Sequence, residues 1–381
     1  MALALEPRRE PSRAMMVAAP VIAVLATLLA GAIVFTLLGH DGPQAVYQIF
    51  VVPLFNPYRW QDLFVKAAPL AIIAIGLSIG FRANIWNIGG EGQYILGGLA
   101  GTGVALMTLD LDGVWILPVM VAAGVVGGMI WAGIPALLKT RFNVSEILSS
   151  LMLNYVAIQL LYYLMRGPWK DPMGFNFPQT AMFSAAQTLP TIVPGTLIHL
   201  GVPVAAALGL TAWFLLARSV TGFQIRVMGL APSAARYGGF SQASTVWLAM
   251  LVGGGMAGLA GILEAAGPFG QMVPQFPTGY GYTAIIVAFL GRLHPLGILV
   301  AALVLALTYV GGESAQTVIG LPSAATGVFQ AMMLFFLLAA DILVRYRLVA
   351  RRETVHAPAV GAARAGAAAE RGRAETGAET A

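Results

Sequence analysis

The sequence contains no cysteine and few charged residues. The absence of cysteine excludes disulfides, iron–sulfur clusters, thiolate zinc sites and cysteine nucleophiles. Only 10% of the 381 residues are Asp, Glu, Lys or Arg, whereas soluble globular domains carry about 25%. Because 58% of the residues are hydrophobic, we expect lipid to be the solvent for most of the chain.

Histidine and lysine are scarce as well. The four histidines are far apart and none lies in a His-Glu-x-x-His pair, which argues against a histidine-based zinc hydrolase. Only one lysine, Lys139, is followed by Thr, and Leu138 stands where a P-loop requires glycine. We therefore expect no metal site, no cofactor, no catalytic residues and no ATP hydrolysis by this chain. The net charge of +5 comes from small basic clusters between apolar runs, a pattern that does not indicate nucleic-acid binding.

The chain has long apolar segments instead. A helix of about 20 apolar residues spans a bilayer, and the first segment is uncharged for 24 residues, too long for the apolar region of a cleavable signal peptide. Stretches of small residues at four-residue spacing, such as GGLAGTG and GLAGILEAAG, indicate close helix packing. We predict ten spans, near 15–38, 63–81, 85–107, 114–138, 145–165, 196–217, 242–264, 280–290, 296–310 and 326–344.

These segments predict an all-α polytopic membrane protein with about ten transmembrane helices. We expect a cytoplasmic N-terminal segment (1–14), a transmembrane domain (15–345) and a disordered cytoplasmic tail (346–381) that lacks apolar periodicity. Seventeen of the 21 basic residues fall on one side of the predicted membrane and four on the other. The positive-inside rule therefore predicts that both termini are cytoplasmic.

Two loops are long enough to carry a function. The external loop, about 166–195, begins RGPWKDP and is a lid, a docking rim or a passive connector. The cytoplasmic loop, about 218–241, mixes arginines with apolar residues. We expect it to form two short helical pieces, broken by Gly and Pro, that serve as a docking surface.

Polar residues at membrane depth are expensive and often functional. The densest group is RANIWNIGGEGQY, in which Asn84, Asn87, Glu91 and Gln93 lie among glycines that weaken a helix. One interpretation is a broken helix that lines a cavity. The other is close helix packing with polar side chains that cap a helix end. Asn154, in the next polar span, faces either a pore or a neighbouring helix.

Four separated motifs point to one family: NIGGEGQ, SEILSSLMLNY, RGPWKDP and GFQIRVMGLAPSAARYGGFS. They resemble the permease subunits of ABC importers of the branched-chain amino acid and simple-sugar type, most closely the nucleoside uptake branch. The resemblance covers about residues 63–344. It implies a second homologous permease subunit, cytoplasmic ATP-binding cassette ATPases and an external substrate-binding lipoprotein as partners.

The resemblance implies that this chain is the permease of a bacterial plasma membrane importer for a nucleoside or similar small polar solute. Alternatives are a sugar or amino-acid permease, or an autonomous ion-coupled carrier, for which Glu91 is the one credible carboxylate. The predicted path or gate residues are Asn84, Trp86, Asn87, Glu91, Gln93, Asn154 and Tyr155. The residues predicted to couple to the ATPase are Gly222, Arg226, Met228, Arg236, Tyr237 and Gly239.

Overall fold

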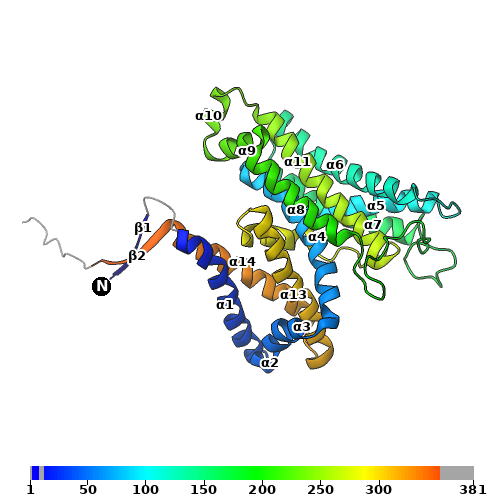
Figure 1. Cartoon of the computed structure of the whole chain (residues 1–381), viewed down its shortest axis with the longest axis horizontal. Helices are drawn as coiled ribbons and strands as arrows, with labels where there is room; N and C mark the ends of the chain where they lie inside the picture. The colour runs from blue at the N-terminus through cyan, green and yellow to red at the C-terminus, as the bar shows by residue number, and fades with distance from the viewer. Residues whose placement is uncertain (1, 8–12, 352–381) are drawn as a thin grey trace, which may run out of the picture. The chain divides into compact units, whose positions relative to one another are not determined.

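Each of the ten predicted apolar segments forms a helix in the computed structural model, which describes residues 2–7 and 13–351 (Figure 1). Helices form because hydrocarbon offers the backbone no other hydrogen-bond partners. The helices are α1 (Arg13–Leu37), α4 (Pro57–Arg82), α5 (Gly90–Met107), α6 (Ile116–Phe142), α7 (Glu146–Arg166), α8 (Gly201–Arg218), α11 (Gln242–Glu264), α12 (Tyr280–Leu290), α13 (Pro295–Ile319) and α14 (Ala324–Arg345).

Among the described residues, eight helices are long and apolar enough to cross a membrane. The two remaining predicted segments form α5 and α12, which are not among these eight helices. Helix α12 has 11 residues, about 16 Å of helix, which covers half of a hydrocarbon core that is about 30 Å thick. The chain is therefore an all-α polytopic membrane protein, as predicted, with one helix of half length.

Shorter elements join these helices. Between α1 and α4 lie α2 (Gly42–Val46), the π-helical turn η1 (Tyr47–Val51) and α3 (Val52–Phe55). The π-helical turn η2 (Ala265–Phe269) extends α11, and α9 (Val220–Leu230) and α10 (Pro232–Tyr237) follow α8. The last two are the pair of short helices predicted for the cytoplasmic loop.

The chain also forms a two-stranded antiparallel ribbon. Strand β1 (Ala2–Pro7) pairs with β2 (Tyr346–Arg351), with Ala2 opposite Arg351. The structure thus differs from the predicted disordered tail in its first six residues, whose Tyr, Leu and Val favour a strand. The remainder of that tail, 352–381, lies outside the described residues.

Glycines set the spacing of α5, α6 and α11. A methyl group on Gly97 of α5 would overlap the backbone of Gly258 of α11. One on Gly128 of α6 would overlap the carbonyl oxygen of Gly254. Only glycine allows such backbone contact, so the small-residue spacing is a packing signal, as predicted. Helix α4 packs against α11 and is mostly buried, whereas most residues of α7 and α8 are not.

The external loop is bonded to the chain that follows α11. The nitrogen of Phe183 donates to the oxygen of Gly270, and that of Leu189 to the oxygen of Ala266, each over 2.8 Å. The Gln187 amide donates to the carbonyl of Ala105, near the end of α5, over 2.9 Å. The loop therefore covers one end of α5 and α11 with a fixed backbone path.

Candidate functional site

The site begins where α4 ends. Asn84 has a left-handed backbone with φ of 58°, and the nitrogen of Ile85 donates to the oxygen of Gly80 over 2.9 Å. The nitrogen of Asn84 donates to Phe81 over 3.1 Å. This pair of bonds is a Schellman motif, in which Asn is the common substitute for Gly. Asn84 thus terminates a helix, and its side chain is exposed.

Residues 83–89 are not helical, so α5 begins at Gly90 rather than near Ile85 as predicted. A methyl group on Gly90 would contact Ile73 and Leu77 at 3.4 Å, which places the start of α5 about 10 Å along α4 from its end. The polar run thus forms a non-helical connection between α4 and α5, and it runs through part of the membrane's depth.

Two side chains of α7 hold this break in place. The Ser150 hydroxyl accepts from the nitrogen of Ile88 over 3.1 Å. The Asn154 amide donates to the oxygen of Ile88 over 3.0 Å and accepts from the nitrogen of Gly92 over 2.8 Å. These bonds satisfy backbone groups that lipid could not. Asn154 is fully buried and faces neighbouring elements, which was one of the two predicted alternatives.

Glu91 joins the start of α5 to the start of α12. Its Oε1 accepts from the nitrogen of Gly279 over 3.0 Å, and its Oε2 from that of Gly281 over 2.7 Å. The first N–H groups of a helix lack partners within it and carry a partial positive charge, which a carboxylate neutralises. The side chain is 1% exposed, so Glu91 is a cap on α12 at membrane depth.

The two helix starts touch through their backbones. A methyl group on Gly281 would overlap the backbone nitrogen of Glu91. Asn154 also donates to the Tyr282 hydroxyl over 3.1 Å. Three elements that are distant in sequence, α5, α7 and α12, thus meet at one point. We call Glu91, Asn154, Gly281 and Tyr282 the junction.

Asn87 and Gln93 form a reciprocal amide pair next to the junction. Asn87 Nδ2 donates to Gln93 Oε1 over 2.9 Å, and Gln93 Nε2 donates to Asn87 Oδ1 over 3.0 Å. The nitrogen of Gly89 also donates to Asn87 Oδ1, over 2.9 Å. Both side chains are at most 2% exposed. Their polar groups satisfy one another, and they brace the chain break.

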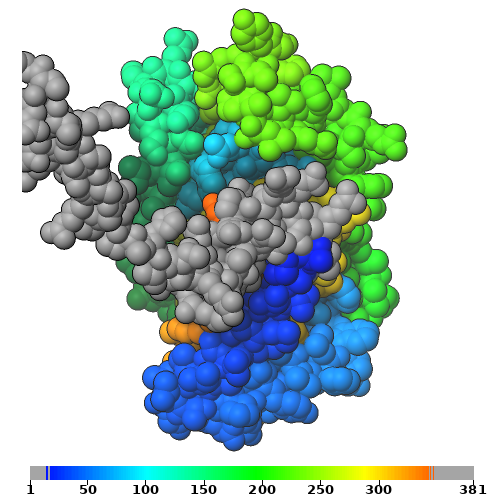
Figure 2. Space-filling model, turned by 90° about the vertical axis from the view of Figure 1, so that its left-hand side faces the viewer, coloured from blue at the N-terminus to red at the C-terminus, as the bar shows by residue number. Residues whose placement is uncertain are grey.

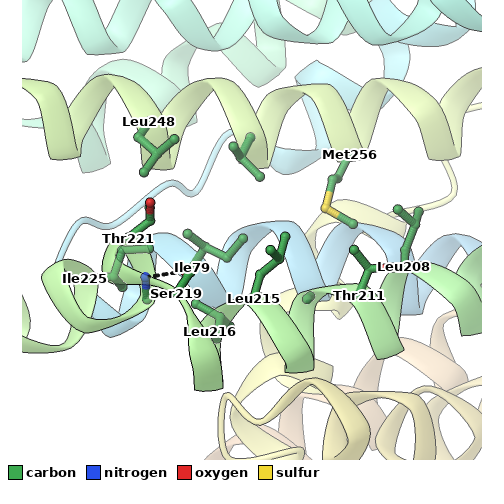
Figure 3. A pocket seen from close by; sticks show the side chains of 13 residues that line it. Ile79, Leu208, Thr211, Leu215, Leu216, Ser219, Thr221, Ile225, Leu248 and Met256 are labelled. Carbon is green, nitrogen blue, oxygen red and sulfur yellow. Dashed lines mark hydrogen bonds between the residues drawn. The ribbon is translucent and has the colours of Figure 1, made fainter.

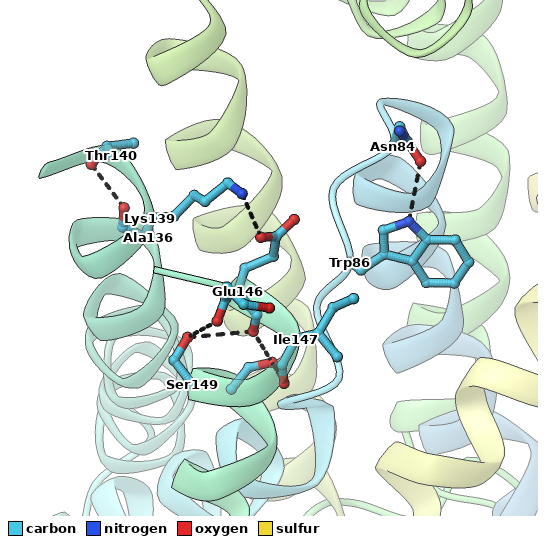
Figure 4. Close-up of polar contacts among 10 residues, drawn as sticks. Asn84, Trp86, Ala136, Lys139, Thr140, Glu146, Ile147 and Ser149 are labelled. Carbon is cyan, nitrogen blue, oxygen red and sulfur yellow. Dashed lines mark hydrogen bonds and ion pairs between the residues drawn. The ribbon is translucent and has the colours of Figure 1, made fainter. Parts of the chain in front are cut away.

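Trp86 lies in an aromatic cluster at the C-terminal end of α4. Its ring centre is 5.3 Å from that of Phe81 and 5.8 Å from that of Phe289. Its Nε1 donates to Asn84 Oδ1 over 3.1 Å (Figure 4). The indole is half-buried, so one edge of an aromatic surface is accessible there.

Tyr155 lies apart from the other predicted path residues. It follows Asn154 on α7 but is 59% exposed, because consecutive helix residues point about 100° apart. Met152 and Gln159 are also exposed, and their spacing places them on the same face of α7. The structure therefore brings together Asn87, Glu91, Gln93 and Asn154, and places Tyr155 on the outer face of α7.

Two ion pairs between helices were not predicted. Lys139 Nζ lies 2.9 Å from Glu146 Oε2 and ties α6 to α7 (Figure 4). Asn143, with φ of 52°, turns the chain between those helices. Lys66 Nζ lies 2.8 Å from Glu313 Oε1, between α4 and α13. One feature of the sequence indicated the first pair: Lys139 and Glu146 are seven residues apart and flank the short gap between two predicted spans. The residues of the second pair are 247 positions apart, so the sequence held no such indication.

The cytoplasmic loop divides into buried and exposed residues. Gly222 and Met228 are buried, and a methyl group on Gly222 would lie 2.5 Å from the carbonyl oxygen of Leu216. These two residues hold α9 against the transmembrane helices. The remaining predicted coupling residues lie on the surface, and Figure 2 shows this segment in light green at the top of the view. They are Arg226, Arg236, Tyr237 and Gly239.

Comparison with known families identifies the fold. Residues 60–338 match the family model described as branched-chain amino acid transport system / permease component. The chain belongs to this permease family. The resemblance found in the sequence motifs is thereby confirmed.

Curated relatives of this permease are ABC transporter permeases. A glucose ABC transporter permease protein of Haloferax volcanii is 37% identical over 91% of this chain and 93% of its own length. A guanosine ABC transporter permease protein of Bacillus subtilis is 28% identical over 86% and 94%. A nucleoside ABC transporter permease protein of Lactococcus lactis is 26% identical over 84% and 89%.

Proposed function

We propose that this chain is the permease subunit of an ABC importer in a bacterial plasma membrane and forms half of the path for a small polar solute. Family membership over residues 60–338 is the observation that carries this proposal. The predicted side on which 17 of the 21 basic residues gather is the cytoplasmic side. A cytoplasmic ATPase would then dock on the α9–α10 segment.

The junction would serve as the framework of the path rather than as its lining. Its carboxylate and amide groups are bonded to backbone, so they fix the starts of α5 and α12 and are not free to bind solute. The exposed face of α7, with Met152, Tyr155 and Gln159, is the surface available to a second permease subunit or to solute between two subunits. Tyr155 and Gln159 supply hydrogen bonds there, and Tyr155 supplies an aromatic ring that suits a sugar or a base.

A nucleoside and a free hexose are the two candidate solutes. The guanosine and nucleoside relatives favour the first, and the glucose relative, at higher identity, favours the second. Both solutes carry a sugar ring. An external binding lipoprotein would select between them before the solute reaches this chain.

The arrangement gives less support to an autonomous ion-coupled carrier. Such a carrier needs a carboxylate that can bind and release an ion. Glu91 already accepts two backbone hydrogen bonds at the start of α12, so binding an ion there would release the helix end.

The test is solute-stimulated ATPase activity of the assembled importer. The chain is co-purified with its native partners and reconstituted in nanodiscs with the external receptor. We expect ATP hydrolysis to rise severalfold with either nucleosides or glucose and to be unchanged by branched-chain amino acids. Absence of any co-purifying ATPase, or stimulation by amino acids alone, would contradict the proposal.

A further inference from the structure

Three arginines from distant parts of the chain line one pocket. Arg82 ends α4, Arg226 lies on α9 and Arg292 lies in the turn between α12 and α13. The pocket has a volume of about 260 Å³ and is completed by Gly222, Leu230 and Leu293. No acidic side chain is among these lining residues. We call it the arginine pocket.

A backbone hydrogen bond holds one of the arginines in the pocket. Arg82 Nε donates to the carbonyl of Leu293 over 2.8 Å, which fixes its guanidinium beside the turn that carries Arg292. Arg82 and Arg292 are half-buried and Arg226 is exposed. Arg226 lies close enough to Arg82 for their like charges to repel each other, and a bound anion with several oxygens would relieve that repulsion. Guanidinium groups bind phosphate oxygens in a bidentate manner.

An apolar groove adjoins the arginine pocket. It has a volume of about 300 Å³ and lies between α8 and α11, with Ile79 of α4 between them (Figure 3). Leu208 and Leu215 line one side, and Leu248 and Met256 the other. Gly222 lines both the groove and the arginine pocket. The arginine pocket and the aliphatic side chains along the membrane-spanning helices therefore adjoin at Gly222, and we treat the two linings as one candidate surface.

We propose that this surface binds one anionic glycerophospholipid. The arginine pocket holds the phosphate, and an acyl chain lies in the groove between α8 and α11. Basic pockets at the cytoplasmic ends of transmembrane helices are suited to anionic headgroups, and positive-inside orientation puts these arginines at that level. A carboxylate from a docked ATPase would match the arginines but would leave the groove unexplained, because a cytoplasmic protein does not reach along α8 and α11.

The position of the lipid connects it to the docking segment. Gly222 and Arg226 both belong to α9, so the lipid headgroup would lie against the inner side of this helix. The lipid would then stabilise α9 on the transmembrane helices. This role does not depend on which solute the importer carries.

The test is lipid binding to the purified full chain by native mass spectrometry. After delipidation in detergent, dioleoylphosphatidylglycerol is titrated and compared with dioleoylphosphatidylcholine, short-chain dihexanoylphosphatidylglycerol and inorganic phosphate. We expect the long-chain anionic lipid to bind at least tenfold more tightly than each of the others. Equal binding of phosphatidylcholine would show that the arginine pocket does not select an anionic headgroup. Equal binding of the short-chain lipid or of phosphate would show that the groove does not bind an acyl chain.

Variants with matched controls test each part of the surface. Arg226→Gln should weaken phosphatidylglycerol binding about fivefold, the effect of about one basic residue near an anionic lipid surface, and Arg226→Lys should retain most of the binding. Leu215→Trp should fill the groove and weaken binding to a similar extent. Arg236→Gln and Leu210→Trp, which lie outside both linings, should leave it unchanged. Wild-type affinity in Arg226→Gln and Leu215→Trp would overturn the proposal.

Discussion

The carboxylate of Glu91 lies 2.7 Å from the backbone nitrogen of Gly281, although the two residues are 190 positions apart in the sequence. A side chain at the start of one helix thus caps the start of another. The bond joins α5, which follows a non-helical segment, to α12, which covers half of the membrane. The two hydrogen bonds of Glu91 therefore connect the starts of these two helices directly.

Removing the charge of Glu91 should destabilise the permease. In Glu91→Gln the amide can accept one N–H, and its NH₂ group faces the other. Hydrogen bonds to charged groups contribute about 1.5–3 kcal/mol each, so we expect a loss of about that size and a lower apparent Tm in detergent. The control is Glu313→Gln, whose side chain is 55% exposed and whose pair should contribute at most about 1 kcal/mol. Equal Tm changes in the two variants would show that Glu91 does not cap α12.

Gly281→Ala should disrupt the same contact sterically. Its methyl group would overlap the backbone of Glu91, so the helix starts would have to separate. The matched control is Gly327→Ala in α14, where a methyl group meets no atom within 4 Å and should stabilise the helix by up to about 1 kcal/mol. We expect opposite shifts in Tm. A Gly281→Ala protein as stable as the wild type would mean that α5 and α12 are farther apart.

Features of the junction that depend on neighbouring residues could be predicted from the sequence, whereas contacts between residues distant in the sequence could not. The glycines among the polar residues of 82–94 indicated either a broken helix or a capped helix end, because glycine weakens a helix. The partners of Glu91, the backbone nitrogens of Gly279 and Gly281, could not be predicted. No sequence pattern near these glycines indicates that a carboxylate about 190 residues away caps the helix that begins there. The sequence also could not show that Tyr155 is exposed while Asn154 is buried. That difference depends on which face of α7 packs against other helices.

The apolar helices and the cytoplasmic loop were more predictable. The length of an apolar run determines whether a helix can span the membrane, and each of the ten predicted segments has a helix in the structure. Pro232 and the glycines around it correctly divided the loop into two short helices. The convergence of Arg82, Arg226 and Arg292 was not predicted, because the positive-inside rule assigns a side of the membrane and no distances.

The stability of the permease should depend on the protonation of His199. This residue precedes α8, is 5% exposed, and its Nδ1 accepts from the nitrogen of Gly201 over 3.1 Å. Burial lowers the pKa of His199 below its usual 6.5. The unfolded chain therefore binds the proton more readily, and the contribution to stability is complete above pH 6.5 and is lost as the pH falls below it.

The measurement is apparent Tm between pH 8 and pH 5 for the wild type and for His199→Asn. Asparagine keeps an acceptor for the Gly201 nitrogen and does not titrate. We expect the decrease in Tm at low pH to be smaller in the variant. An identical pH profile would assign the acid sensitivity to other groups.

Exposed residues of α10 should control ATPase binding. Tyr237 is 99% exposed, and interfaces commonly depend on Tyr and Arg anchors. Tyr237→Ala and Arg236→Glu should each weaken co-purification of the ATPase at least tenfold, as expected for a loss of about 1.4 kcal/mol or more. Arg141→Glu, an exposed change on α6 outside this loop, is the control. ATPase recovery equal to that of the control would exclude α10 from the docking surface.

Uptake of radiolabelled nucleoside or glucose into proteoliposomes tests the central claim that this chain is a permease powered by partner subunits. The chain is reconstituted alone and together with its second permease, ATPases and external receptor, with either ATP or an imposed proton or sodium gradient. We predict uptake by the full assembly with ATP and none by the chain alone under either condition. Gradient-driven uptake by this single polypeptide would contradict it.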